Sequence, residues 1–335
     1  MNSIIQYIPF WLLLFAFTGC KEKDVDALSG EETVTVTLNI SASSNESRAD
    51  RGYPDVDAYE GIRTLRVFVT DEAMTKIYYN EKTDVVENPD GITSSIVKHQ
   101  ITIPGIPVGN VTFYVIANEE SLGVTYTTEE IRNNLENRKL EYIDDETPKH
   151  FPKKGSEIKE LGLPMSGKKT FNITKDNKIV QMVVERAVTK LSLTVENATS
   201  GTIQLNNVAF GSFFGDRFYI FPEVNLDVPE EASYTSVAYD NVGLEVGPNE
   251  TSPSLSLYLY PTYAWKAGQP TSPYTLSLVT GNYTYQAQVF APGVNSFRRN
   301  TQVNIHARIT TTVGMLINYA VQSWGSYTID VPEFN

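Results

Sequence analysis

Apolar and polar residues alternate along several short segments of this 335-residue chain. The clearest segment covers residues 33–40, where Val34, Val36, Leu38 and Ile40 occupy every second position and Thr or Asn stands between them. Successive side chains of a β-strand point to opposite faces, so this pattern predicts a strand with one buried face. We therefore expect residues 33–40 to form the first strand of the fold.

Further segments of this kind follow at short intervals along the chain. Val, Thr, Ile and Tyr dominate them, and these residue types are favoured in strands. The predicted strands cover residues 62–70, 96–103, 111–117, 171–173, 179–184, 191–195, 203–210, 254–260, 274–280, 283–290, 301–308 and 314–321. Strands at this spacing, with Gly and Pro turns between them, indicate β-sandwiches rather than alternating strand–helix units.

One segment has helical periodicity. Within residues 127–140, Ile131, Leu135 and Leu140 fall on one face, as in an amphipathic helix. Thr128 can cap the N-terminus, and the two glutamates that follow it suit the first turn of a helix. We expect this one short helix in an otherwise β fold.

The length of the chain allows two domains. Removal of the export signal described below leaves about 315 residues, enough for two domains of ordinary size. We place the boundary near Glu185, so that residues 52–185 form an N-terminal domain and residues 186–335 a C-terminal domain. No repeat of fixed period marks either half.

The first 20 residues have the pattern of an export signal. Residues 8–17 are ten apolar residues, which suit the core of a signal peptide and are too few to span a bilayer as a helix. The segment ending in Gly19-Cys20 resembles a lipobox, so we expect cleavage between these residues and lipidation of Cys20. The charged residues 21–24 are similar to the tract that routes some Bacteroidetes lipoproteins to the outer surface. An ordinary secretory signal with a chance cysteine is the alternative, and the usual basic residues before the apolar run are missing.

Charge and cysteine content narrow the classes of function. The chain has 40 acidic and 27 basic residues and a formal charge of −13, which argues against binding to nucleic acid or to a membrane surface through a basic patch. Cys20 is the only cysteine, so the fold has no disulfide and depends on its core.

Side chains suited to catalysis or metal binding are scattered. His99, His150 and His306 lie far apart and have no carboxylate or cysteine at ligand spacing, so we expect no metal site. No phosphate loop, dinucleotide fingerprint or nucleophile elbow is present in the sequence. We therefore expect neither a cofactor nor an enzyme.

Two other clusters leave alternatives open. Asp55, Asp57 and Glu60 could bind calcium, although an acidic loop of this kind can also simply be solvated. An aromatic cluster later in the chain could stack on sugar rings or could pack in the core. It consists of Tyr258, Tyr260, Tyr263 and Trp265.

Several short motifs together resemble one family. Residues 113–119 form an apolar strand that ends in Ala-Asn-Glu, and residues 163–167 read Leu-Pro-Met-Ser-Gly. Residues 184–191 contain Arg-Ala-Val-Thr-Lys-Leu, and Arg299-Asn300 precedes the last strands, which end in Val-Gln-Ser-Trp. Their order across most of the chain, behind a lipobox, resembles the fimbrillin superfamily of Bacteroidetes, the FimA- and Mfa-type pilus subunits. The chain departs from the family pattern at Thr189, where Ala is usual.

The resemblance implies a mainly β fold of two transthyretin-like β-sandwich domains in tandem. It also implies a non-enzymatic subunit, delivered to the outer membrane and cell surface as a lipoprotein, that polymerises by strand exchange and contributes to adhesion. In this family a trypsin-like surface protease cuts after an arginine in the first long loop. Residues 20–51 would then be the N-terminal segment that contains the removable strand, with the cut after Arg48 or, as second choice, Arg51.

The resemblance also implies a donor strand from another subunit, which replaces residues 33–40. It maps to residues 315–331, where apolar positions alternate in two stretches: Met315, Ile317, Tyr319 and Val321, and then Tyr327, Ile329 and Val331. An incoming strand satisfies unpaired backbone groups while its alternate side chains fill pockets. Without the resemblance, both segments would be interpreted as permanent first and last strands.

The implied partners are other fimbrial subunits, the protease, the outer membrane through the lipid before processing, and a ligand on host or bacterial surfaces. Two other functions compete with the stalk subunit. One is a monomeric surface lipoprotein that binds glycans through Trp265 and the nearby tyrosines. The other is an accessory subunit of the same fimbria, either an anchor that keeps its lipid or a tip adhesin.

Overall fold

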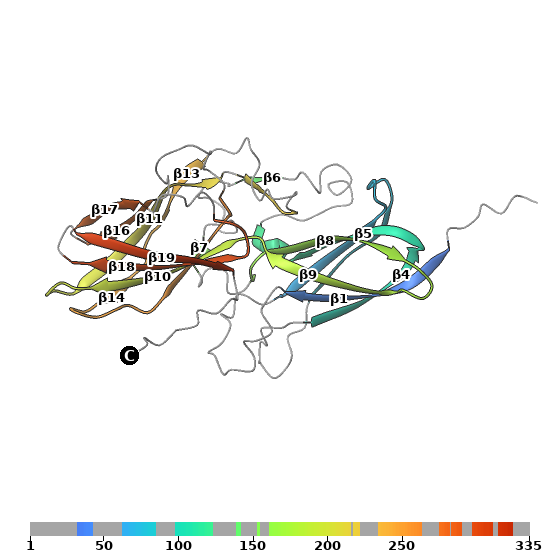
Figure 1. Ribbon diagram of the computed structural model, residues 1–335, viewed down its shortest axis with the longest axis horizontal. Helices are drawn as coiled ribbons and strands as arrows, with labels where there is room; N and C mark the ends of the chain where they lie inside the picture. Colours follow the sequence, from blue (N-terminus) through green and yellow to red (C-terminus); the bar gives the residue numbers. More distant parts are fainter. Residues whose placement is uncertain are drawn as a thin grey trace, which may run out of the picture. The chain divides into compact units, whose positions relative to one another are not determined.

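The computed structural model confirms a fold built almost entirely of β-strands (Figure 1). All described residues except Glu32 belong to one unit, Thr33–Asn335. The structure describes residues 32–42, 62–84, 98–122, 139–141, 153–154, 161–215, 217–221, 234–262, 275–281, 283–289, 297–310 and 314–323.

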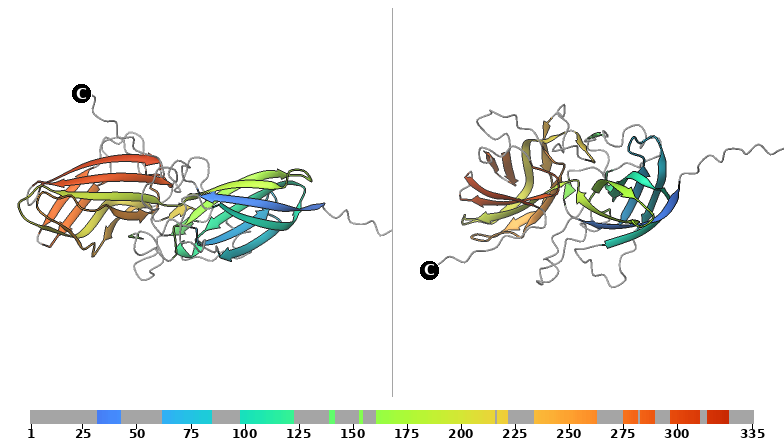
Figure 2. Two further views of the ribbon diagram at one scale, coloured as in Figure 1. Left: turned by 90° about the horizontal axis from the view of Figure 1, so that it is seen from below. Right: turned by 45° about the vertical axis from the view of Figure 1, so that its right-hand side comes forward.

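Seven strands from the first half of the chain form one continuous sheet in the order β3-β2-β5-β8-β9-β1-β4. The strands are β1 (Thr33–Ala42), β2 (Thr64–Thr70), β3 (Ile77–Asp84), β4 (Lys98–Pro107), β5 (Gly109–Ala117), β8 (Met165–Ile173) and β9 (Ile179–Arg186). Neighbours are antiparallel except β1 and β9, which run parallel. Strands β8 and β9 share only two register pairs, so the sheet turns there and its two parts enclose a common core (Figure 2).

The core of this first sheet follows from the alternation seen in the sequence. Strand β1 buries every second residue, and β9 does the same along its full length. Strand β5 is buried on both faces from Val111 onwards. On one face Phe113 packs edge-to-face on Phe171 of β8 at 5.8 Å, and on the other Tyr114 packs on Phe221 at 5.2 Å. Burial on both faces makes β5 a core strand of this half.

The second half of the chain forms two five-stranded sheets, one of which includes the short strand β7 from the first half. One has the order β19-β18-β10-β15-β7, and the other has the order β13-β11-β16-β17 with β14 beside β11. The first contains β7 (Lys153–Lys154), β10 (Thr189–Asn197), β15 (Leu255–Leu259), β18 (Thr301–Ile309) and β19 (Met315–Ser323). The second contains β11 (Ile203–Gly215), β13 (Tyr234–Tyr239), β14 (Leu244–Val246), β16 (Thr275–Thr280) and β17 (Thr284–Val289). A second buried cluster draws side chains from both sheets, as expected for a β-sandwich.

A small two-stranded sheet corrects one expectation. Lys139 and Leu140 were predicted to end a helix, but they belong to β6 (Lys139–Glu141), which pairs with β12 (Arg217–Tyr219). Leu140 lies opposite Phe218, so long-range strand pairing overrides the local helical pattern. The rest of the predicted helix, residues 127–138, lies outside the described residues. The described helical segment of this half is one short 3₁₀ turn, Glu119–Leu122.

The predicted domain boundary near Glu185 stays a prediction. Strand β9 ends at Arg186 in the first sheet, and β10 begins at Thr189 in the next. The first core cluster, however, also contains Phe218, Tyr258 and other residues from the second half of the chain. The first core therefore draws side chains from the second half of the chain, and β7 of the first half joins a sheet of the second.

Gly167 marks the close approach of β8 to β9. A Cβ atom at this position would lie 2.6 Å from the backbone oxygen of Val183, a distance that forces the backbone to move. Glycine is required here by lack of space, because its φ is not in the left-handed region.

We predict that Gly167→Ala lowers the free energy of unfolding by about 1–3 kcal/mol, because the added methyl group overpacks a backbone contact. Gly201→Ala is the matched control, since a Cβ there meets nothing within 4 Å. Urea unfolding of both variants measures the difference. Equal stability of the two variants would contradict the close approach of β8 and β9.

Candidate functional site

Strand β1 is inserted between two strands that do not pair with each other. It is antiparallel to β4 from Thr33 to Ser41 and parallel to β9 from Thr37 to Ala42. Among the described strands, β4 has β1 as its only ladder partner. If β1 left, β4 and β9 would each expose a row of unpaired backbone groups.

The inward side chains of β1 form part of the first core. Val36 and Leu38 are 0% exposed and Ile40 is 1% exposed, while Val34 is half-buried. Each fully buried aliphatic side chain contributes ~1.5–3 kcal/mol. Removal of this strand would therefore leave an apolar groove between β4 and β9.

The first half of the predicted donor segment forms β19. This strand pairs with β18 in an antiparallel register from Met315 to Ser323 and lies at the edge of its sheet. The predicted alternation is present, because Met315 is buried and Ile317 and Tyr319 pack against the second core. Val321 departs from it and is 48% exposed. In this structure the segment therefore has a partner within its own chain.

The remaining predicted site residues lie outside the described residues. They are Gly19 and Cys20 of the lipobox, Arg48 and Arg51 of the cleavage loop, and Tyr327, Ile329 and Val331 of the second donor stretch. The acidic candidates Asp55, Asp57 and Glu60 and the histidine His150 also lie there.

The Ala-Asn-Glu motif ends strand β5 and fixes the start of β2. Asn118 has a left-handed backbone, with φ of 56°. Its side-chain oxygen accepts hydrogen bonds from the backbone N–H groups of Arg63 at 2.7 Å and Thr64 at 3.2 Å. Its amide group donates to the backbone oxygen of Leu163 at 2.7 Å. One buried asparagine thus satisfies three backbone groups from two other segments.

Two further motif residues, Ser166 and Glu185, meet at the buried guanidinium of Arg299, which is 6% exposed. It donates to the hydroxyl of Ser166 and to the backbone oxygens of Glu185 and Ile220, each at 2.8 Å. Ser166 also donates to the backbone oxygen of Ile220. The Ser-Gly, Glu-Arg and Arg-Asn motifs therefore converge on one network that ties β8, β9 and the residues after β12 together. The motifs are visible in the sequence, but their convergence on one guanidinium is not, because residues far apart in sequence form the network.

A group of linked polar side chains around His306 lies on the outer face of the β19-β18-β10-β15-β7 sheet. The Nε2 atom of His306 is 3.0 Å from a carboxylate oxygen of Glu196, and its Nδ1 atom is 3.2 Å from the hydroxyl of Thr194. Arg308 donates to the same glutamate at 2.9 Å. The hydrogen bond from His306 and the charge of Arg308 hold the pKa of Glu196 below its ordinary value. These contacts connect β10 to β18.

No group of three or more metal-binding side chains occurs within the described part of the chain. Within the same residues, no helix is long and apolar enough to cross a membrane. Tyr258 and Tyr260 are buried in the first core, so the interpretation of the aromatic cluster as core packing is confirmed for these two. Tyr263 and Trp265 lie outside the described residues.

No protein-family model and no curated protein sequence matches the chain. Solved structures do match it over most of its length. A C-terminally truncated form of the tip fimbrial protein Mfa3 from Porphyromonas gingivalis is 14% identical with a TM-score of 0.51, covering 87% of this chain and 100% of the truncated form. A proposed cell adhesion protein from Parabacteroides distasonis is 14% identical with a TM-score of 0.55, covering 90% of this chain and 99% of that one.

The chain has the fold of these fimbrial and adhesion proteins. A fimbrial assembly protein from Parabacteroides distasonis agrees, at 14% identity, a TM-score of 0.51, and coverage of 87% of this chain and 96% of the other. The likeness confirms, at the level of the fold, the resemblance that the sequence motifs indicated.

We predict that Arg299→Met lowers the free energy of unfolding by at least about 2 kcal/mol, since a single unsatisfied buried acceptor costs ~1–3 kcal/mol. Arg308→Met is the matched control. Its side chain is 51% exposed and pairs only at the surface, so its loss changes stability by less than about 1 kcal/mol. Chemical unfolding curves compare the two. Similar effects from both substitutions would argue against the buried network.

Proposed function

We propose that this chain is a structural subunit of a cell-surface fimbria, exported as a lipoprotein precursor, and not an enzyme. The fold it shares with fimbrial proteins supports this function. The observation that carries the proposal is the position of β1. This first described strand lies between β4 and β9, and those two strands form no ladder with each other.

The covalent connection of β1 to the rest of the chain holds it in place in this proposal. Val36, Leu38 and Ile40 together contribute roughly 5–9 kcal/mol by burial. Ordering about ten residues costs ~1–2 kcal/mol each, or roughly 10–20 kcal/mol in total, so burial of these three side chains does not offset it alone. The strand stays bound because its two ladders add to burial and because its tether gives it a high effective concentration.

Proteolysis removes that tether. A cut after Arg48, or after Arg51 as second choice, separates β1 from β2 in the sequence, together with Cys20 and its lipid. The peptide that contains β1 then competes with the donor strand of another subunit for the same groove. This mechanism requires export of the precursor to the outer membrane. Its partners are a trypsin-like protease and other fimbrial subunits.

The donor is residues 315–331 in our proposal. Apolar residues at every second position match the spacing of the inward residues of β1. The first stretch would have to give up its register with β18 before it could act as a donor. An anchor or tip subunit would use the same groove as acceptor, and an anchor would keep Cys20.

We predict that limited trypsin treatment of the purified precursor cuts near Arg48 and yields ladders that survive mild detergent. Loss of both candidate arginines, in the Arg48→Ala and Arg51→Ala double variant, blocks cutting and assembly. Arg308→Ala is the control, because this exposed arginine lies on β18, far from the loop in sequence. Mass spectrometry locates the cut and gel electrophoresis shows the ladder. A protein that is cut yet remains monomeric would contradict polymerisation.

We also predict that a synthetic peptide of residues 315–331 binds the cut subunit and shortens the ladders, but does not bind the uncut precursor. The same peptide with Ile317→Asp and Ile329→Asp should bind at least about tenfold more weakly, because buried carboxylates are costly. Fluorescence anisotropy of the labelled peptides measures both. Equal binding of the two peptides would exclude this segment as the donor.

A further inference from the structure

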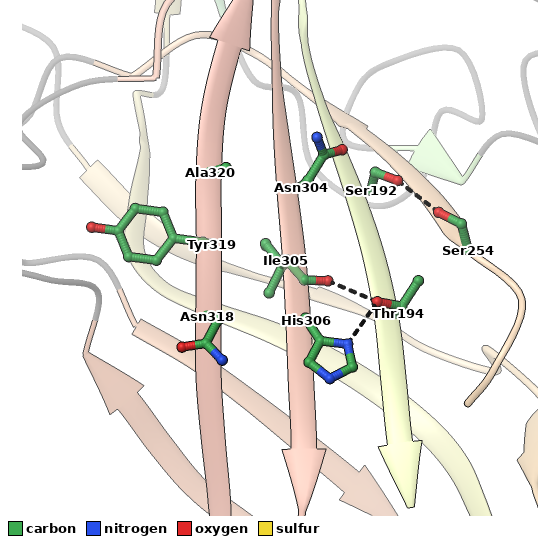
Figure 3. Close-up of a pocket in the computed structure, with 9 residues that line it drawn as sticks. All are labelled: Ser192, Thr194, Ser254, Asn304, Ile305, His306, Asn318, Tyr319 and Ala320. Atoms are coloured by element: carbon green, nitrogen blue, oxygen red, sulfur yellow. Dashed lines mark hydrogen bonds between the residues drawn. The ribbon is translucent and has the colours of Figure 1, made fainter. Parts of the chain in front are cut away.

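The outer face of the β19-β18-β10-β15-β7 sheet carries a hollow of about 470 Å³ (Figure 3). Its floor is a row of residues in register across three strands, in which Ser192 of β10 lies opposite Asn304 of β18, and Asn304 lies opposite Ala320 of β19. The neighbouring row contains the larger His306 and Asn318. Small side chains beside larger ones produce the depression.

Side chains at the edge of the hollow are held in place by hydrogen bonds. The hydroxyls of Ser192 and Ser254 are 2.6 Å apart. The ring of His306 is fixed from both sides, by Thr194 at Nδ1 and by Glu196 at Nε2 (Figure 3 shows the first contact). A site whose groups are already oriented loses less entropy when it binds a ligand.

The chemistry of the lining favours an uncharged ligand. No Lys, Arg, Asp or Glu is among the described residues that line the hollow. The adjacent charges of Glu196 and Arg308 are paired with each other, and the chain as a whole carries −13. Hydroxyl and amide groups each donate and accept hydrogen bonds, as a polyhydroxylated ligand requires.

We propose that this hollow binds a neutral saccharide through the hydroxyls of Ser192 and Ser254 and the amides of Asn304 and Asn318. Figure 3 shows the ring of Tyr319 pointing away from these side chains, so aromatic stacking has no part in the proposal. A single site of this kind binds weakly. Many copies along a fimbria would raise the avidity by about 10²–10⁴. Only this gain in avidity rests on the proposed function, and the site itself does not.

The test uses the intact, unprocessed precursor, in which β19 is paired with β18. The precursor is bound to an immobilised panel of neutral oligosaccharides ending in galactose, mannose, fucose, N-acetylglucosamine or N-acetylgalactosamine, and of acidic ones ending in sialic acid. We expect binding to one or more neutral members. Because the precursor has not been cut, the result does not depend on whether the protein polymerises.

Two tryptophan variants on the same face of β19 make the test specific to the hollow. Ala320→Trp fills it and should weaken binding by roughly tenfold or more, as expected from the loss of one or two hydrogen bonds. Leu316→Trp is the control, because Leu316 is 59% exposed on that face but does not line the hollow. It should leave binding unchanged. Unfolding curves of both variants verify that they fold.

Three outcomes would overturn the proposal. The first is the absence of binding to every neutral member of the panel. The second is binding to sialic acid alone. The third is binding that Ala320→Trp and Leu316→Trp leave equally intact, because the contact would then lie elsewhere on the protein.

Discussion

The pairing of β1 with β4 on one side and β9 on the other is the constraint on which the first half of the molecule depends. A similar arrangement recurs in the second half. There, β10 lies between an antiparallel neighbour, β15, and a parallel neighbour, β18. The local packing of the two strands is therefore alike. They differ in connection, because only Ala187 and Val188 separate β9 from β10, whereas β1 stands at the start of the described chain. Whether such a strand can be exchanged depends on how it is connected more than on how it is packed.

The motifs that indicated the family turn out to be structural. Asn118 satisfies the backbone where β2 begins, Gly167 allows β8 to approach β9, and Arg299 ties three segments together. None of them lines the hollow on the outer sheet. This division explains why short motifs and a shared fold identify the architecture at 14% identity while leaving the ligand and the role within a fimbria open. Such residues preserve a scaffold, and function lies in sites added to it.

Strand positions could be predicted from the sequence wherever one face is buried and the other is not. The alternation in β1, β9, β10 and β18 placed these strands within two residues of their observed bounds. Strand β3 gave no such signal, because it is half-exposed at its start and fully exposed at its end. The parallel pairing of β1 with β9 could not be predicted, since residues far apart in sequence carry it. The same holds for the hollow, where register alone brings Ser192, Asn304 and Ala320 together.

The energetics of strand exchange place a demand on the donor. If residues 315–323 left β18, the sandwich of the second half would lose a complete antiparallel ladder and the burial of Met315. The inward residues of β18, among them Val303 and Ile305, would then lie in an edge strand without the neighbouring residues of β19 beside them. Gains in the groove of a neighbouring subunit would be offset by losses of a similar kind. A favourable exchange therefore needs either an additional contribution from residues beyond Ser323 or a high barrier to withdrawal once the donor is seated. In the second case the fimbria would persist for kinetic reasons, because a strand between β4 and β9 must break both ladders at once to leave. The cut β1 faces the same barrier, so its replacement by a donor would itself be slow.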